Sequence, residues 1–207
     1  MRFFFGFLSV MQYPVLKKRE RKRAKAMQNL EEKFLKREEI YNGKVLHVVK
    51  DTVIIPNGEQ SIREFCMHVG AVSVLPLLDD GTVIMERQYR YAHGSVLFEI
   101  PAGKLNSPDE DRLEAAKREL REETGAVAQR WTDLGLLIPT PALVNERIQM
   151  FLAEDITFGK QQLDDDEFLE LERIPLSTLK EMVMRGEIPD AKTQICILKV
   201  AEMKKLP

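Results

Sequence analysis

The sequence predicts a layered domain of the α/β (α+β) class, preceded by a small antiparallel β-rich unit. Two β-hairpin patterns in the first half of the chain, one well-marked helix in the middle and two helix patterns near the end predict this class. The 207 residues are 44% hydrophobic and 31% charged, which suits one substantial core with a small appended unit. The net charge of −2 gives no whole-chain electrostatic case for a nucleic-acid partner.

Residues 1–26 differ in composition from the rest of the chain. A short apolar run at residues 3–8 precedes a basic block at residues 17–25. A secretory signal has the opposite order, and the run is far below the ~20 residues that cross a bilayer. We expect these residues to form a disordered or locally helical extension. The folded region, and even the true start of the chain, is expected at about Met27. Attachment to a membrane surface through this segment is the alternative.

The two cysteines, Cys66 and Cys196, are far apart and match no metal-binding or redox spacing. We therefore expect reduced, packed residues of a cytoplasmic protein.

Strand patterns occupy much of the folded region. The first two flank the sequence PNG at residues 56–58, and the next two flank DDG at residues 79–81. Both sequences are typical of hairpin turns. The expected strands are residues 44–55, 61–68, 72–78, 83–89, 96–100, 131–138 and 148–153.

The central helix carries signals at both ends. The sequence SPDE at residues 107–110 has the capping-box pattern, with proline at the first helical position. Leu113, Ala116 and Leu120 recur on one face, and Gly125 stands where the helix should end. Two further helices are expected at residues 177–185 and 190–203.

The same helix has an acidic face. On a helical wheel, Glu119, Glu122 and Glu123 fall within an arc of about 100° beside the apolar face. Ala115 is the only other residue in that arc, and no lysine or arginine lies inside it. Such a cluster is either a solvated face balanced by neighbouring arginines or a set of hard oxygen ligands for Mg²⁺ or Mn²⁺. The wheel alone leaves both interpretations open.

The spacing around this helix resembles the Nudix box, G-x5-E-x7-R-E-U-x-E-E-x-G-U, in which U is an aliphatic residue. Gly103, Glu110 and the run RELREETGA at residues 118–126 supply its fixed positions. One departure is that six residues, not five, separate Gly103 from Glu110. The extra residue falls in the loop before the helix and should not disturb the acidic face.

Further stretches resemble the branch of Nudix hydrolases that contains ADP-ribose pyrophosphatases and nucleoside diphosphate sugar hydrolases. Pro141 stands where that branch carries a proline, although the usual Ser-Pro-Gly-Phe is Thr-Pro-Ala-Leu here. The resemblance covers roughly residues 30–201. The other stretches are QYR at 88–90, EIPAGKL at 99–105, DDEFLE at 165–170 and DAKT at 190–193.

The resemblance implies a Nudix α/β/α sandwich with a mixed β-sheet over residues 67–207. It also implies that residues 27–66 form a β-rich unit that pairs two subunits. We therefore expect a homodimer, with Arg63 as a candidate substrate contact from this unit. The expected partner is a small nucleotide-sugar substrate, with no nucleic acid and no membrane.

The resemblance also assigns metal ligands. Mg²⁺, with Mn²⁺ as an alternative, would be held by Glu119 and Glu123, with Glu122 sharing or bridging and the backbone carbonyl of Ala102 completing the site. Arg118 would orient the glutamates. Glu122 and Arg118 thus belong to the catalytic group as well.

Other residues are implied in substrate binding and proton transfer. Arg90 would hold a phosphate or the terminal ribose side, where its planar fork gives directed hydrogen bonds. Glu99 and Pro141 are further candidate substrate contacts. The general base is expected in the acidic loop at residues 164–167, with Glu167 favoured and Asp166 second.

The expected reaction is metal-dependent hydrolysis of ADP-ribose to AMP and ribose 5-phosphate. One alternative is a broader nucleoside diphosphate sugar hydrolase, such as a GDP-mannose pyrophosphatase. A second is a non-catalytic ADP-ribose-binding regulator that uses the basic N-terminal segment on nucleic acid. Retention of all the box glutamates favours an enzyme.

Overall fold

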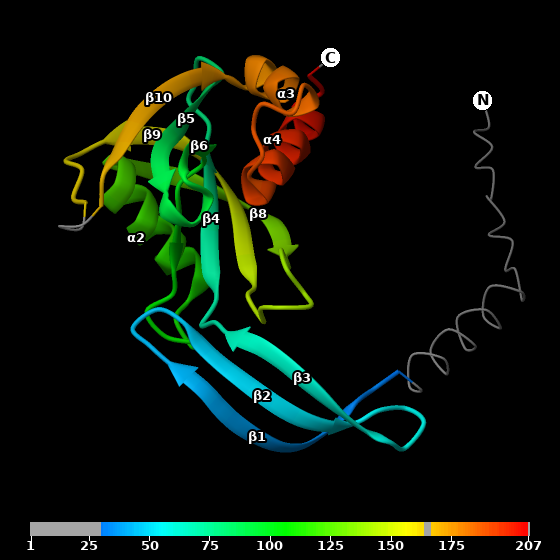
Figure 1. The fold of residues 1–207 in the computed structure, drawn as a ribbon. Helices are drawn as coiled ribbons and strands as arrows, with labels where there is room; N and C mark the ends of the chain where they lie inside the picture. Colours follow the sequence, from blue (N-terminus) through cyan, green and yellow to red (C-terminus); the bar gives the residue numbers. More distant parts are fainter. Residues whose placement is uncertain (1–29, 164–166, 207) are drawn as a thin grey trace, which may run out of the picture. The chain divides into compact units, whose positions relative to one another are not determined.

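The computed structural model describes residues 30–163 and 167–206 (Figure 1). The predicted extension over residues 1–26 and the candidate base Asp166 lie outside the described residues. The chain divides into two compact units, one ending at Phe65 and the other beginning at Cys66. Among the helices described, none is long and apolar enough to cross a membrane.

The first unit is a three-stranded sheet in the order β1-β2-β3, with β1 antiparallel to β2. The predicted hairpin matches β2 and β3, but the sequence analysis missed β1. All side chains of β1 are exposed, so this strand lacks the alternation of a half-buried strand. The strands are β1 (Lys33–Asn42), β2 (His47–Ile54) and β3 (Gln60–Met67).

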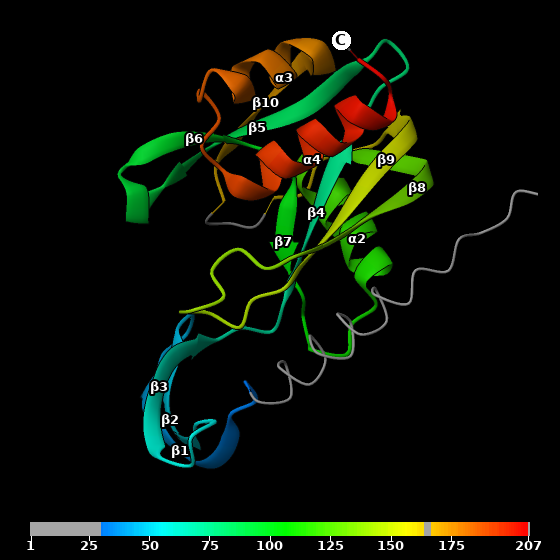
Figure 2. The same ribbon diagram turned by 90° about the vertical axis from the view of Figure 1, so that its right-hand side faces the viewer.

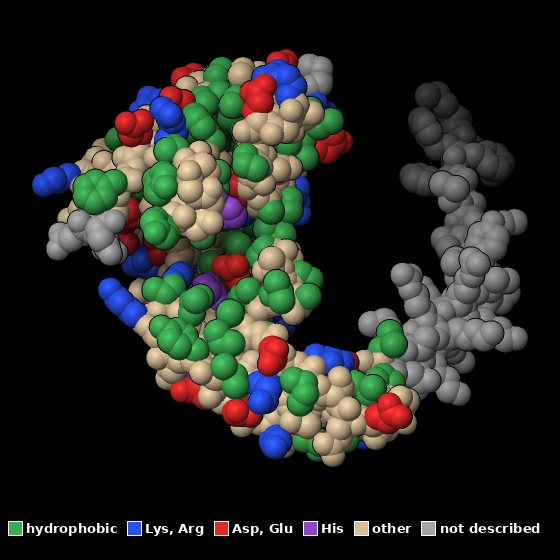
Figure 3. Space-filling view, in the orientation of Figure 1, with side chains coloured by type: hydrophobic (Ala, Val, Ile, Leu, Met, Phe, Trp, Pro, Cys, Tyr) green, Lys and Arg blue, Asp and Glu red, His purple; other side chains and the backbone are tan. Residues whose placement is uncertain are grey.

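Arg37 of β1 faces Asp51 of β2 in the register of this sheet. Its Nε and Nη2 each lie 2.7 Å from a carboxylate oxygen of Asp51, and this bidentate pair lowers the pKa of Asp51. Many large apolar side chains nevertheless stay exposed on the unit (Figure 3). They are Leu30, Phe34, Leu35, Ile40, Tyr41, Val45, Leu46 and Ile62.

The second unit contains two sheets. The mixed sheet has the order β7-β4-β9-β8, in which only the β4–β9 pair is parallel, and the other sheet is antiparallel, β10-β5-β6. The strands of the mixed sheet are β4 (Ala71–Pro76), β7 (Ala102–Lys104), β8 (Ala126–Leu137) and β9 (Ile148–Phe158). Those of the antiparallel sheet are β5 (Thr82–Arg90), β6 (Ser95–Glu99) and β10 (Leu169–Pro175), with the 3₁₀ turn η1 (Tyr91–His93) between β5 and β6.

The predicted second hairpin is wrong beyond its turn. The turn forms, because Leu78 N donates to Thr82 O at 2.8 Å and Leu77 bridges Val83. The two strands then enter different sheets: β7 and β9 occupy both edges of β4, so β5 pairs with β6 and β10 instead. All six residues of β4 are buried, as expected of a central strand covered on both faces. Strands β7 and β10 were not predicted.

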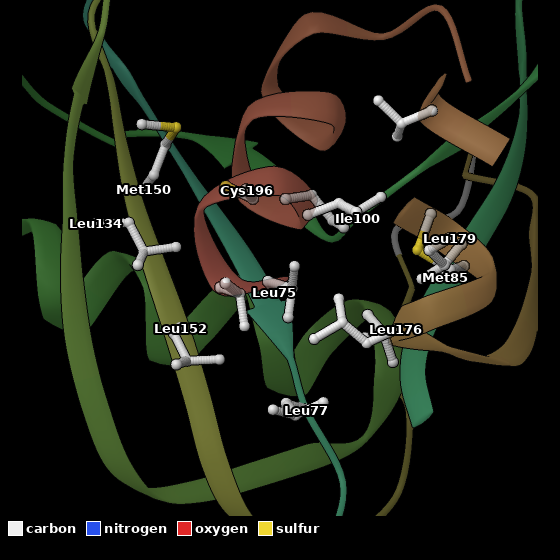
Figure 4. Packing of buried hydrophobic residues seen from close by; sticks show 14 of the residues in the cluster. Leu75, Leu77, Met85, Ile100, Leu134, Met150, Leu152, Leu176, Leu179 and Cys196 are labelled. Atoms are coloured by element: carbon white, nitrogen blue, oxygen red, sulfur yellow. The ribbon is translucent and has the colours of Figure 1, made fainter. Parts of the chain in front are cut away.

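Helix α2 (Arg112–Thr124) lies on one side of the mixed sheet, and α3 (Leu176–Met184) and α4 (Ala191–Met203) lie on the other (Figures 1 and 2). Strand β4 serves both cores because its side chains alternate between the faces. Val72 and Val74 belong to the same core cluster as Leu120 of α2, and Leu75 belongs to the other cluster, with Leu179 of α3 (Figure 4). The α+β class predicted from the sequence is confirmed.

Helix α2 begins later than predicted. Asp111 is its N-cap, accepting from Leu113 N at 2.9 Å and Glu114 N at 3.0 Å. The expected capping box at residues 107–110 instead forms a turn, in which the Glu110 carboxylate bonds back to Asn106 N. The predicted end of the helix is confirmed, with Gly125 at φ 70°.

Replacing Gly125 by alanine should lower the free energy of unfolding by more than the ~1–2 kcal/mol of a left-handed alanine. The extra loss is expected because a Cβ at Gly125 would lie 2.8 Å from Gly159 O. Urea unfolding measures the difference. The matched control is Gly186→Ala after α3, where φ is 77° but nothing lies within 4 Å of the new Cβ. Equal losses for the two variants would show that the contact with Gly159 does not matter.

Candidate active site

The acidic face of α2 lies against β7. Glu123 is 5% exposed, and its carboxylate accepts a hydrogen bond from Ala102 N at 3.0 Å. The Glu119 carboxylate lies over Gly103, where a Cβ would come within 2.0 Å of Glu119 Cδ. The missing side chain at Gly103 therefore makes room for Glu119 beside the backbone of Ala102. Three of the four predicted metal ligands meet at this point.

Arg118 connects the glutamates of the box. Its Nη1 donates to Glu119 Oε1 at 2.7 Å and to Glu122 Oε2 at 3.2 Å, and its Nη2 lies 3.3 Å from Glu110 Oε1. The helical wheel placed Arg118 outside the acidic arc, but its long side chain reaches back across it. Its contacts are those of a residue that orients carboxylates.

A further carboxylate, which sequence reasoning missed, lies in the same region. Glu86 of β5 is 3% exposed and pairs in register with Glu99 of β6. Its Oε1 has no hydrogen-bond partner among the described residues. Burial, together with the charges of Glu167 and Glu99, raises the pKa of Glu86 to about 8. A glutamate directly after the apolar run VIM at residues 83–85 was the available signal.

Negative charge is crowded at this site. Burial and the charges of Glu86, Glu119 and Glu167 raise the pKa of Glu123 to about 10, although Ala102 N works in the opposite direction. Burial also raises the pKa of Glu119, although Arg118 opposes the shift. Carboxylates that repel one another in a buried place fit a divalent cation with hard oxygen ligands.

The carboxylates do not form a closed metal cage. Within the described parts of the chain, no group of three or more His, Cys, Asp and Glu side chains is arranged to hold a metal ion. Mg²⁺ does not require such a cage, because it keeps several waters and is usually bound through one or two carboxylates together with substrate phosphates. The donor set therefore fits a divalent cation that completes its coordination with water or other oxygen ligands.

Glu167, the favoured base, lies just before β10. Its charge contributes to the raised pKa values of Glu86, Glu119 and Glu123, so its carboxylate is close to the acidic face of α2. The structure thus brings together residues that lie on either side of the box in the sequence.

A cavity of about 540 Å³ opens beside this face, and Ala102 and Gly103 form part of its wall. Arg90 lines it as well, and its Nε and Nη2 donate to Glu99 at 2.7 and 3.0 Å. Burial works to raise the pKa of Glu99, but Arg90 and Lys192 outweigh it and hold this pKa at about 2. Glu99 is therefore ionised and engaged with cations.

Two further predicted substrate contacts belong to other elements of the chain. Pro141 is exposed in the β8–β9 connection, and Pro139 lines the cavity instead. Arg63 belongs to the first unit, where its Nε donates to Glu32 Oε2 at 2.8 Å. Their roles stay predictions.

The mixed sheet between helices, with the glutamates of α2 beside Gly103, agrees with the Nudix fold that the sequence resemblance implied. The Nudix domain family matches residues 67–193, so the chain belongs to this family. It is a Nudix hydrolase, as the sequence motifs predicted.

Known proteins agree with this assignment. The chain is 39% identical over 173 residues to an ADP-ribose pyrophosphatase of Bacillus subtilis (strain 168), covering 83% of this chain and 93% of the relative. It is 34% identical over 169 residues to a methanol dehydrogenase activator of Bacillus methanolicus, covering 81% and 91%. A crystal structure of an ADP compounds hydrolase superposes with a TM-score of 0.72 at 22% identity, covering 85% and 96% of the two chains. This last similarity confirms the predicted fold.

Proposed function

We propose that this chain hydrolyses the pyrophosphate bond of ADP-ribose, releasing AMP and ribose 5-phosphate, or the corresponding bond of a related nucleoside diphosphate sugar. The main support is the cavity whose wall contains Arg90 together with Ala102 and Gly103, and these last two residues lie next to the acidic face of α2. A diphosphate bound there would have Arg90 as a cationic contact and would lie next to the backbone that carries the carboxylate cluster. Similarity to an ADP-ribose pyrophosphatase over most of both chains supports the same substrate class.

The proposal includes a divalent metal, Mg²⁺ or Mn²⁺, held by Glu119, Glu122, Glu123 and the carbonyl of Ala102. A bound metal supplies positive charge for the phosphate oxygens and acidifies a coordinated water. Arg118 contributes orientation, since it fixes Glu119 and Glu122 at the same time.

Two further residues are proposed to act on the substrate and the water. Arg90 binds a substrate phosphate or the terminal ribose side through its guanidinium group, whose position Glu99 sets. Glu167 accepts the proton of the attacking water as the bond to phosphorus forms and the phosphoanhydride bond breaks. Removal of this proton makes the water a better nucleophile, while the leaving phosphate departs with the electrons of the broken bond.

The proposed working form is a cytoplasmic homodimer paired through the first unit. The exposed apolar side chains on this unit support pairing, because a monomer rarely leaves so many of them uncovered in one small sheet. Both cysteines are free, which agrees with a reducing compartment. Light scattering that finds a stable, active monomer would contradict the dimer.

A substrate panel tests the proposed reaction. ADP-ribose incubated with the protein and Mg²⁺ should yield AMP and ribose 5-phosphate in equal amounts, as resolved by chromatography. Chelation with EDTA should stop the reaction, and added Mg²⁺ or Mn²⁺ should restore it. Faster cleavage of GDP-mannose would assign the alternative substrate, and binding of ADP-ribose without cleavage would indicate a regulator.

A further inference from the structure

The proposed mechanism gives no role to the sequence DAKT at residues 190–193, at the start of α4. Asp190 and Lys192 nevertheless line the same cavity as Arg90. Lys192 is only 9% exposed, which is rare for a lysine unless it is paired. A buried lysine in the wall of the cavity requires an explanation.

The partners of Lys192 are two carboxylates. Its Nζ donates a short hydrogen bond to Glu99 Oε2 and lies 3.1 Å from Asp190 Oδ2. Glu99 is itself 3% exposed and binds Arg90 through both of its oxygens. One buried carboxylate thus stands between two cations, of which only Arg90 has a substantially exposed side chain, at 41%.

The neighbouring residue of the motif fixes the same stretch of backbone. The hydroxyl oxygen of Thr193 accepts from Ile100 N at 3.0 Å, and this hydroxyl donates to Asp190 Oδ2 at 2.6 Å. The start of α4 therefore holds Glu99 by its side chain and Ile100 by its backbone. This stretch leads directly to Ala102.

The charges explain what Lys192 contributes. Without Lys192, Arg90 and Glu99 would form a neutral pair, and an anionic substrate would compete with Glu99 for the guanidinium group. With Lys192, the three groups carry a net charge of +1, and Glu99 keeps a counter-charge when Arg90 turns to the substrate. Asp190 pairs with Lys192 as well and offsets part of this charge, but its carboxylate also caps α4, where the positive end of the helix dipole partly compensates it.

We propose that Lys192 is a positioning residue that neutralises Glu99 and thereby leaves Arg90 available to the anionic substrate. This inference rests on the proposed function, since it assigns Arg90 to a substrate oxygen anion. Lys192 acts through Glu99 and Arg90 and takes no part in proton transfer. Loss of Lys192 should weaken substrate binding more than it lowers the turnover of the bound substrate.

Steady-state kinetics with ADP-ribose and saturating Mg²⁺ provide the test. Lys192→Met, which keeps the length of the side chain and removes its charge, should raise KM about tenfold, the scale of one charge-assisted hydrogen bond. Its kcat should stay within about threefold of the wild-type value, because Lys192 takes no part in proton transfer. Lys199→Met is the matched control, because Lys199 also lies on α4 but contacts Leu134 O and does not line the cavity.

Lys192→Arg separates charge from packing. If the charge on Glu99 matters, the arginine variant should keep a KM closer to wild type than the methionine variant. If Lys192 only fills space, the smaller, apolar methionine should be tolerated better than the bulkier arginine, and that order would overturn the proposal. Thermal unfolding of each variant reports whether it folds. If the methionine variant does not fold, the arginine variant is compared with the wild type instead.

A double-mutant cycle tests the route through Arg90. In an Arg90→Ala background, Lys192→Met should raise KM by much less than it does alone, because the group it positions is gone. A full additional tenfold increase would overturn the proposal. Wild-type protein that cleaves neither ADP-ribose nor a related nucleoside diphosphate sugar would refute the proposed function itself, whereas an active wild type with unchanged KM in Lys192→Met would refute this inference alone.

Discussion

Replacing Glu119 by glutamine should reduce kcat for ADP-ribose hydrolysis by at least about a hundredfold while leaving the fold intact. Glu119 lies over Gly103 with 12% of its side chain exposed, so a neutral amide of the same shape fits the same space. The amide oxygen can still accept the hydrogen bond from Arg118 Nη1. What disappears is the negative charge that a divalent cation needs from its ligands.

The loss should appear in metal binding as well as in turnover. Mn²⁺ titration followed by electron paramagnetic resonance should show weaker binding to Glu119→Gln than to wild type. Glu114→Gln is the control on the same helix, since Glu114 is 67% exposed and pairs only with Lys117 among the described ion pairs. Turnover and Mn²⁺ affinity close to wild type in Glu119→Gln would show that this residue holds no metal.

Local signals predicted the parts of the fold that neighbours in the sequence determine. The end of α2 at Gly125 and the start of α4 next to Asp190, its N-cap in the structure, follow from single residues with strong conformational preferences. The partners of a strand are different, because they depend on which edges remain available after folding. Nothing in the turn at residues 79–81 reveals that β7 and β9 already occupy both edges of β4.

The candidate site shows the same division. The box residues Glu119, Glu122 and Glu123 could be predicted because they share one turn and a half of one helix. The apolar run before Glu86 could have marked it as buried, but its position next to the box residues depends on the packing of β5 against distant elements. The role of Lys192 could not be predicted for the same reason. The motif around it was visible in the sequence, but its contact with Glu99 joins residues 93 positions apart.

Glu167→Gln should lower kcat by about 10²–10⁴-fold, the usual contribution of a general base, and should change KM for ADP-ribose far less. Glutamine keeps the size of the side chain but cannot accept a proton at neutral pH. Glu167 is not among the proposed metal ligands, so Mn²⁺ binding should change far less than in Glu119→Gln. Loss of turnover with intact Mn²⁺ affinity therefore distinguishes a base from a ligand.

Two comparisons make this assignment testable. Glu170→Gln changes an exposed carboxylate on the neighbouring strand β10, which pairs with Arg87 at 3.4 Å, and should leave kcat near the wild-type value. Asp166→Asn tests the second candidate in the same loop, and a larger loss of kcat there than in Glu167→Gln would transfer the role of base to Asp166. A metal ligand must approach the ion in the resting protein, whereas a base must reach only the water that attacks phosphorus. For that reason a base on a loop outside the box helix is compatible with the fixed carboxylates of α2.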